Sequence, residues 1–296
     1  MDLDVTARPA PGVGGSWSSC GMGFDALFLG VPAAMPRVGE AQPSNGPRDH
    51  AAASVPLDYV HFTVVLDSVR RFARVTGVNV DGALLVEIDR ADRWQFDERI
   101  PVDWQAGPAV YAANDLDRGH LVRRRDPVWG SPEVAARANS DTFHFTNAAP
   151  QASGFNQSKE LWLGLEDHVL EHARVHRQRL SVFTAPVLAQ GDPPYRGIRI
   201  PLRFWKIVAW NTGRDELASL GFVVDQAPLV ETGELREPAP GEAPALGPFR
   251  TFQVPIGDIA TLAGLVMPDL VEADRLPATI AEVGWRRIET PDEIAY

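Results

Sequence analysis

Apolar residues in this chain gather in short runs, a pattern typical of β-strands separated by turns. The run over residues 60–66 predicts a strand, Asp67-Ser68 a turn, and residues 72–80 a second strand that ends at Asp81-Gly82. Two β-rich runs joined by a short turn predict a hairpin. Residues 84–88 could extend the same sheet. Further strands are predicted over three more apolar runs, at residues 180–188, 198–210 and 217–225.

A four-residue repeat of apolar side chains predicts one long helix over residues 156–178. Its apolar stripe consists of Leu161, Leu165, Val169 and Ala173, widened by Trp162 and Leu170. Other elements are shorter: a helix near residues 132–137, a strand over 143–146 by alternation, and an amphipathic helix over 256–264 that precedes a C-terminal tail.

The connecting segments indicate one domain with long loops. Residues 1–20 are rich in Gly, Pro and Ser and are predicted to be a flexible N-terminal segment. Residues 32–56 and 237–248 have the composition of loops. No internal repeat and no linker divides the remainder. We therefore expect a single α+β domain over residues 21–296.

The bulk composition excludes several classes of protein. The 296 residues are 45% hydrophobic, which supports a core, and no apolar run of about 18 residues predicts a membrane span. The single cysteine, Cys20, excludes a disulfide framework and a cysteine-rich zinc site. Met1-Asp2-Leu3-Asp4 lacks the basic start of a secretory signal. We expect a cytoplasmic location or export by a signal-independent route.

The charge pattern points to a local phosphate site and away from a broad basic surface. The net charge of −11 would repel nucleic acid overall. The basic residues, however, are almost all arginines, and two groups are clustered: Arg70-Arg71 with Arg74, and Arg118 with Arg123-Arg124-Arg125. The planar guanidinium suits phosphate oxygens, so the sequence indicates a focused phosphate site.

The residues needed for metal-assisted phosphodiester hydrolysis are present in the middle of the chain. Such a reaction needs a base for water, donors for the phosphoryl oxygens, and a cation for the leaving oxygen. His120 follows Arg118 and Gly119, and a neutral histidine is a suitable base near pH 7. Asn147 and Asn156 follow, the second at the start of the predicted long helix. By itself Asn156 could be a helix N-cap.

Three sequence blocks resemble the DNA/RNA nonspecific endonuclease family. The first is the run from Asp117-Arg118-Gly119-His120 to Arg124, and the second runs from Asp141 through Asn147 to Gln151 and on to Asn156, Trp162 and Glu166. A third, upstream block covers residues 59–62 and 78–82. The resemblance spans about residues 21–265. It implies an α+β fold of the ββα-metal type, with a central antiparallel sheet flanked by helices and long loops.

The resemblance also implies a role for each residue of these blocks. His120 would be the general base that activates water, and Asn156 the direct ligand of one divalent ion, Mg²⁺ with Mn²⁺ or another divalent ion as the alternative. Arg118 would contact the phosphate, and Asn147 would orient the base or the scissile group. Arg74 falls where family members place a second phosphate-binding arginine. The implied products carry 5′-phosphates.

Two acidic residues are candidates for ordering the metal-bound waters. The Leu165-Glu166 pair matches the sequence block of the family, and this match assigns the water-ordering role to Glu166. Asn156 and Glu166 are ten residues apart, however, and at about 100° per residue they lie on different faces of a continuous helix. Glu160, four residues after Asn156, shares its face. We favour Glu166.

Some histidines invite a metal interpretation that their spacing does not support. His168, His172 and His176 share one helical face, but three ligands spread over two turns are too far apart for one ion, so a solvated face is expected. His144 alternates with Phe143 and Phe145 and is expected to be structural.

The sequence thus predicts a Mg²⁺-dependent endonuclease that cleaves DNA and RNA with little sequence preference and whose activity falls steeply with salt. Two alternatives are a phosphodiesterase of the same fold acting on small phosphate esters and a catalytically silent nucleic-acid-binding module. A homodimer and an inhibitor protein are possible partners. No membrane association is expected.

Overall fold

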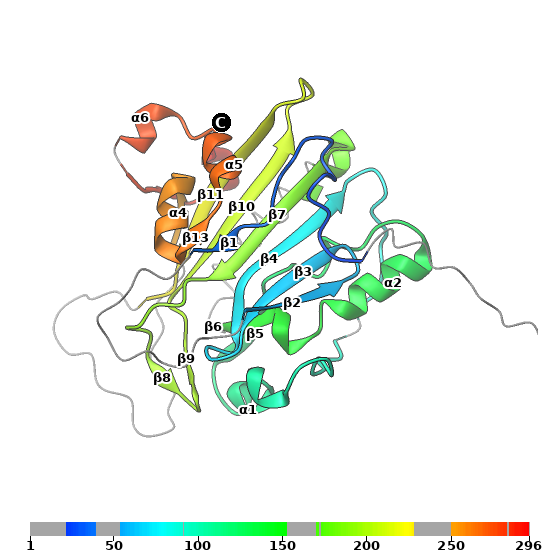
Figure 1. The fold of residues 1–296 in the computed structure, drawn as a ribbon, viewed down its shortest axis with the longest axis vertical. Helices are drawn as coiled ribbons and strands as arrows, with labels where there is room; N and C mark the ends of the chain where they lie inside the picture. Colours follow the sequence, from blue (N-terminus) through cyan, green and yellow to red (C-terminus); the bar gives the residue numbers. More distant parts are fainter. Residues whose placement is uncertain are drawn as a thin grey trace, which may run out of the picture.

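A large antiparallel sheet forms the centre of the molecule (Figure 1). The computed structural model describes residues 22–39, 54–90, 92–152, 170–171, 173–227, 250–282 and 284–295. Eight strands pair in the order β14-β12-β11-β10-β7-β4-β3-β2. Their bounds are β2 Ser54–Tyr59, β3 Phe62–Asp67, β4 Phe72–Asp81, β7 Arg179–Pro186, β10 Arg203–Asn211, β11 Leu217–Asp225, β12 Arg250–Val254 and β14 Arg286–Ile288.

Both faces of the central sheet are buried, which explains why its strands appear in the sequence as continuous apolar runs. In β10, Phe204 and Val208 point to one face and Trp205 and Ile207 to the other, as the two-residue period of a strand requires. The first face packs against the segment that carries Asp117-Arg118-Gly119-His120, called the DRGH motif below. The second packs against residues 29–33 and the C-terminal helices.

Smaller elements cover the two faces. Three two-stranded sheets pair β1 (Arg37–Val38) with β13 (Leu265–Val266), β5 (Leu116–His120) with β6 (Ala148–Ala152), and β8 (Pro194–Tyr195) with β9 (Ile198–Arg199). The helices are α1 Pro108–Tyr111, α2 Pro132–Asp141, α4 Ile256–Ala263, α5 Pro268–Glu272 and α6 Ala278–Ala281, with short 3₁₀ turns η1 Val102–Trp104, η2 Phe145–Asn147 and η4 Pro291–Glu293. In Figure 1, α4 and α5 lie near β10 and β11, while α1 and α2 lie on the opposite side of the molecule.

Local chemistry sets the ends of the helices. The Ser131 side chain accepts a hydrogen bond from the Val134 N–H at the start of α2, and Pro132 occupies the first turn, where a missing N–H costs nothing. Gly264 ends α4 in the left-handed conformation at φ 63°, which glycine adopts without strain.

Several sequence predictions are confirmed, and five are wrong. The first hairpin, β11 and α4 lie where predicted, and the predicted helix near residues 132–137 is α2. The strand expected over residues 198–210 is divided between β9 and β10, which belong to different sheets. Residues 143–146 do not form a strand, because Phe145–Asn147 is a 3₁₀ turn leading into β6. Residues 84–88 do not extend the sheet: Leu85 makes an isolated bridge with Trp129.

The other two errors concern segments predicted to lack regular structure. The loop expected up to residue 56 contains the first residues of β2, and the C-terminal tail contains two helices and the edge strand β14. Each of these two strands pairs with the sheet on one side only, so neither needs the two-sided apolar pattern of a central strand.

The predicted long helix is described only near its end. Residues 170, 171 and 173–176 are helical, and Leu170 and Ala173 of the predicted stripe are buried. The predicted segments 1–20 and 237–248 lie outside the described residues. No described helix is long and apolar enough to cross a membrane.

Candidate active site

The DRGH motif forms β5, which pairs with β6 beneath the central sheet. His120 lies opposite Ala148, Gly119 opposite Ala149 and Arg118 opposite Pro150. Because alternate side chains share a strand face, Arg118 and His120 point to the same side. These two strands, followed by the helical residues near 170–176, supply the two β elements and the helix end of the expected ββα unit.

Gly119 is required by close packing within this pair of strands. A Cβ atom at this position would lie 2.0 Å from Gln151 Cδ, far inside van der Waals contact. In the structure the side chain of Gln151 occupies the space that a side chain at this position would need. The glycine therefore fixes the packing of β5 on β6.

A buried glutamine joins β6 to the central sheet. The Gln226 side chain accepts a hydrogen bond from the Ala152 N–H (3.2 Å) and donates to the carbonyls of Pro150 (3.2 Å) and Pro201 (2.7 Å). It has no exposed surface. The sequence analysis missed Gln226, because nothing in its local pattern distinguishes it from a solvated residue after a strand.

Asn147 holds the chain directly after His120. Its Oδ1 accepts from the Val122 N–H (2.8 Å), and its Nδ2 donates to the carbonyls of Val122 (2.9 Å) and Thr142 (3.0 Å). The side chain is fully buried, so its amide is committed to the backbone. Of the two roles expected for Asn147, this geometry favours orientation of the base segment over contact with the scissile group.

Aromatic rings surround the imidazole of His120. The ring centroid of Trp94 lies 4.7 Å from that of His120, and Phe143 meets it edge-on at 5.1 Å. The imidazole is partly exposed, but its Nε2 atom is buried and has no hydrogen-bond partner within the described chain. A buried nitrogen without a partner is costly, and in the tautomer with its proton on Nδ1 this one accepts a hydrogen bond from a water molecule or a substrate hydroxyl.

Burial keeps this imidazole neutral. The pKa of His120 is lowered to about 3, mostly by desolvation and in part by the positive charges of Arg90 and Arg124, which Asp92 opposes. In the free protein the ring therefore accepts protons only weakly. A phosphate bound beside it would raise the pKa, because a negative charge stabilises the imidazolium.

Arg118 is the basic residue best placed for substrate. It is exposed, its guanidinium carbon lies 5.6 Å from the Trp94 ring centroid, and it makes no ion pair with another described residue. Its neighbours have partners: Arg124 donates to the Ile88 carbonyl (2.9 Å) and to Asn139 (3.1 Å), and Arg125 pairs with Glu87.

The other arginine cluster serves the fold. Arg70 pairs with the buried Asp192, and Arg71 donates to the Gln105 carbonyl. Arg74, which the sequence assigned to substrate binding, pairs through Nε with the buried Asp67 at 2.9 Å. This ion pair holds the guanidinium near the turn that joins β3 and β4, and substrate binding by Arg74 stays a prediction of the sequence.

The predicted metal ligand cannot be placed. Asn156, Glu160 and Glu166 lie outside the described residues, as do His168 and His172. Within the described ranges, no group of three or more His, Cys, Asp or Glu side chains could hold a metal ion. A Mg²⁺ ion that keeps its waters needs only one or two protein oxygens, a set that Asn156 could provide without such a group.

A segment that the sequence analysis did not discuss covers the histidine. Gln95 is bound on both sides, with its N–H donating to the Phe143 carbonyl and its carbonyl accepting from the Phe145 N–H, each at 3.0 Å. These bonds place Trp94 against His120. The alternation of aromatic and polar residues at Trp94, Gln95 and Phe96 could have indicated that this segment packs on the protein. It does not show which element the aromatic rings contact.

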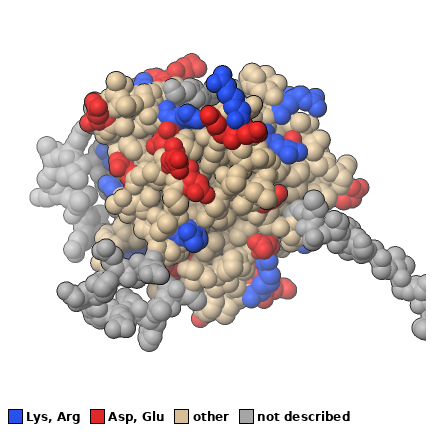
Figure 2. Space-filling model, turned by 45° about the horizontal axis from the view of Figure 1, so that its top comes forward, with Lys and Arg blue, Asp and Glu red and all other residues tan. Residues whose placement is uncertain are grey.

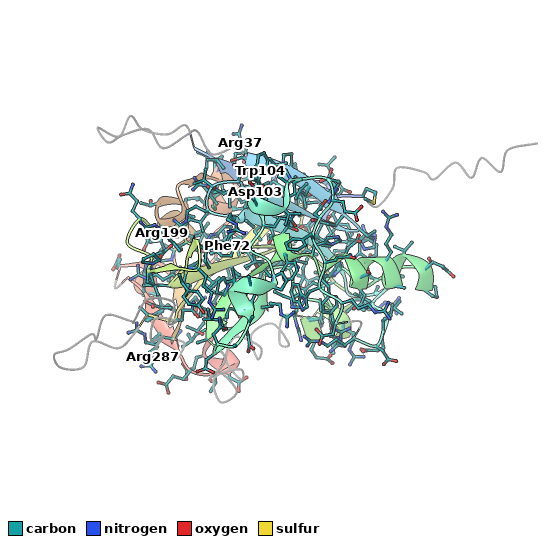
Figure 3. The ribbon with its side chains drawn as sticks, turned by 90° about the horizontal axis from the view of Figure 1, so that it is seen from below. Arg37, Phe72, Asp103, Trp104, Arg199 and Arg287 are labelled. Carbon is teal, nitrogen blue, oxygen red and sulfur yellow. The ribbon has the colours of Figure 1, made fainter. Side chains whose placement is uncertain are left out.

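Acidic and basic side chains are mixed on the visible surface, and apolar side chains lie inside. On the face shown in Figure 2, acidic and basic side chains are interspersed. Seen from below, Phe72 lies in the interior, whereas Arg37, Arg199 and Arg287 lie toward the periphery (Figure 3).

Comparison with known proteins identifies the class to which this fold and site belong. Residues 46–274 match the DNA/RNA non-specific endonuclease family, and the chain belongs to that family. A solved structure of the EndoG/EndoGI complex, described as showing the mechanism of EndoG inhibition, is 18% identical and has a TM-score of 0.50, covering 75% of this chain and 85% of that one. The fold is thus that of a ββα-metal nuclease, as predicted.

The chain also resembles a protein without an assigned activity. It is 38% identical over 269 residues to the uncharacterized protein y4fB of Sinorhizobium fredii, a match that covers 85% of this chain. The match covers 40% of that relative's length.

Proposed function

We propose that this nuclease is a sugar-nonspecific endonuclease that hydrolyses DNA and RNA, with His120 as its general base. The observation that supports this most is the environment of the His120 imidazole. It is neutral, packed against Trp94 and Phe143, and its buried Nε2 has no partner within the described chain. Nε2 would take the proton of the attacking water, and Arg118, on the same strand face, would hold the phosphoryl oxygens.

The remaining roles rest on the sequence blocks. Asn156 would hold one divalent ion, Mg²⁺ by preference, and Glu166, or else Glu160, would order its waters. The ion would stabilise negative charge on the leaving oxygen. Among the charged described side chains near His120, basic residues outnumber acidic ones: Arg90 and Arg124, with Arg118 over the Trp94 ring, against Asp92. They suit a phosphate, so oxygen ligands for a cation would come from residues 153–169.

The direct test is digestion of supercoiled plasmid and of total RNA with Mg²⁺ and with EDTA. Cleavage of both substrates that EDTA abolishes, with 5′-phosphates on the new ends, is the expected result. Comparing plasmid with a chromogenic diester separates this function from a phosphodiesterase of small esters. Absence of cleavage with every divalent ion would overturn the proposal and favour a silent binding module. Homodimerisation and an inhibitor protein stay predictions of the sequence.

Arg118→Met is expected to raise the KM for DNA by about 10- to 100-fold, because a charged hydrogen bond to phosphate contributes about 1.5–3 kcal/mol. It should also reduce the dependence of log kcat/KM on log salt by about one unit. Kinetics between low and moderate salt measure both effects. Arg125→Met is the matched control, since Arg125 is already paired with Glu87. Equal effects of the two substitutions would show that Arg118 has no special contact.

On the acid side of its pH profile, kcat/KM should fall only at a pH well below the usual pKa of histidine. Because the pKa of His120 is lowered to about 3 in the free protein, the neutral base persists as pH falls through the usual histidine range near 6.5. The limb of kcat should lie higher, since bound phosphate raises the pKa. Arg90→Met should move the kcat/KM limb upward, because Arg90 lowers this pKa. Arg37→Met, on the other side of the sheet, should not.

A further inference from the structure

A second buried polar atom near His120 has no partner, and the proposed mechanism does not use it. Tyr111 Oη is buried and makes no hydrogen bond with any described residue, although the residue as a whole is partly exposed. A buried hydroxyl without a partner costs about 1–3 kcal/mol, and native proteins keep few such groups. A ligand that supplies the missing acceptor would account for it.

Tyr111 is firmly held at the edge of the DRGH strand. It is the last residue of α1, and α1 packs against β5. Asn114 braces this junction, because its Nδ2 donates to the Val110 carbonyl (2.6 Å) and to the Tyr195 hydroxyl (2.7 Å), while its Oδ1 accepts from the Leu116 N–H (3.0 Å). These bonds fix the backbone between Tyr111 and the start of β5.

A chain of ring contacts connects Tyr111 with His120. The ring of Tyr111 lies nearly parallel to that of Phe145, with centroids 6.4 Å apart. Phe145 is 5.8 Å from Trp94, and Trp94 is 4.7 Å from His120. The two unpartnered atoms therefore belong to side chains of one aromatic cluster, formed by Trp94, Phe143, Phe145, Tyr111 and His120.

The charge beside the Tyr111 hydroxyl selects the kind of ligand. Burial raises the pKa of Tyr111 well above its usual value, and Arg118 partly opposes this. The hydroxyl thus stays protonated and can donate. A hydroxyl donor near an exposed arginine favours an anionic oxygen, since both groups can donate to it.

We propose that the Tyr111 hydroxyl donates a hydrogen bond to a phosphate oxygen of the bound nucleic acid, next to the phosphate contact of Arg118. Tyr111 is then a further substrate-contacting residue, and the inference rests on the proposed nuclease function.

Tyr111→Phe tests this with removal of a single oxygen. The free energy of unfolding should stay unchanged or rise slightly, because the variant loses no hydrogen bond within the described chain. kcat/KM for Mg²⁺-dependent plasmid cleavage should fall about 10- to 100-fold, the effect of a hydrogen bond to a charged group. Tyr195→Phe is the control: its hydroxyl accepts from Asn114, so it should lose stability while keeping kcat/KM within about 3-fold.

Binding provides a readout that does not depend on cleavage. Fluorescence anisotropy with a single-stranded oligonucleotide in EDTA should show weaker binding for Tyr111→Phe than for the wild type. Unchanged kcat/KM and unchanged binding would overturn the inference while leaving the nuclease function in place. Reduced stability together with reduced activity would also overturn it, by showing a structural role. A wild type that binds the oligonucleotide but never cleaves would refute the proposed function alone.

Discussion

His120→Ala is expected to lower kcat/KM for plasmid cleavage by about 10²- to 10⁴-fold, the usual contribution of a positioned general base. The two rings that pack against the imidazole, Trp94 and Phe143, have no basic atom that could replace Nε2. Loss of the base should lower kcat much more than it changes KM, since the imidazole acts on the water and not on the phosphate. Initial rates over a range of DNA concentrations separate the two constants.

His144→Ala is the matched control for this substitution. His144 is near the same aromatic cluster, but its Nδ1 is bonded at 2.8 Å to the Asp141 carbonyl and its Nε2 lies 3.1 Å from Gln95 Nε2. Its removal should change kcat by less than about 5-fold, with some loss of stability. If His120→Ala kept more than a tenth of wild-type activity, another group would have to be the base.

The parts of the fold that sequence predicts best are those with a two-sided apolar pattern. The strands β4, β7, β10 and β11 are buried on both faces of the sheet. Their residues are therefore almost all apolar, and this run of apolar residues is visible in a single sequence. Residues 143–146 show the limit. Their alternation is real, but hydrogen bonds from Asn147 to Val122 and Thr142 hold the segment in a turn. Such contacts between distant segments leave no local pattern.

The same distinction applies to the candidate site. The DRGH motif is contiguous, so the sequence alone identifies His120 and Arg118 as candidate site residues. Arg118 is exposed, as contact with substrate requires. Arg74 was assigned to substrate from a short match, whereas its pairing with Asp67 depends on the turn between β3 and β4. Trp94 and Tyr111 come from separate segments, and only the folded chain shows that they share one aromatic cluster.

Asn147→Ala should lower the free energy of unfolding by at least about 3 kcal/mol, because it leaves three buried backbone groups unpaired at about 1–3 kcal/mol each. The groups concerned are the N–H and carbonyl of Val122 and the carbonyl of Thr142. Denaturant unfolding followed by tryptophan fluorescence measures this change. Asn211→Ala is the comparison, since that partly exposed amide bonds Leu29 and Gly213 where water can replace it. It should cost less than about 1 kcal/mol.

The two effects of Asn147→Ala together decide between the roles expected for this residue. If Asn147 orients the base, its loss frees the segment after His120, and kcat should fall in conditions where the variant is still fully folded. Asn147→Asp should not restore activity, because a carboxylate oxygen would replace the Nδ2 donor and face the carbonyls of Val122 and Thr142. An Asn147→Ala variant with normal stability and a raised KM would instead place the amide on the substrate, against the buried geometry of the folded chain.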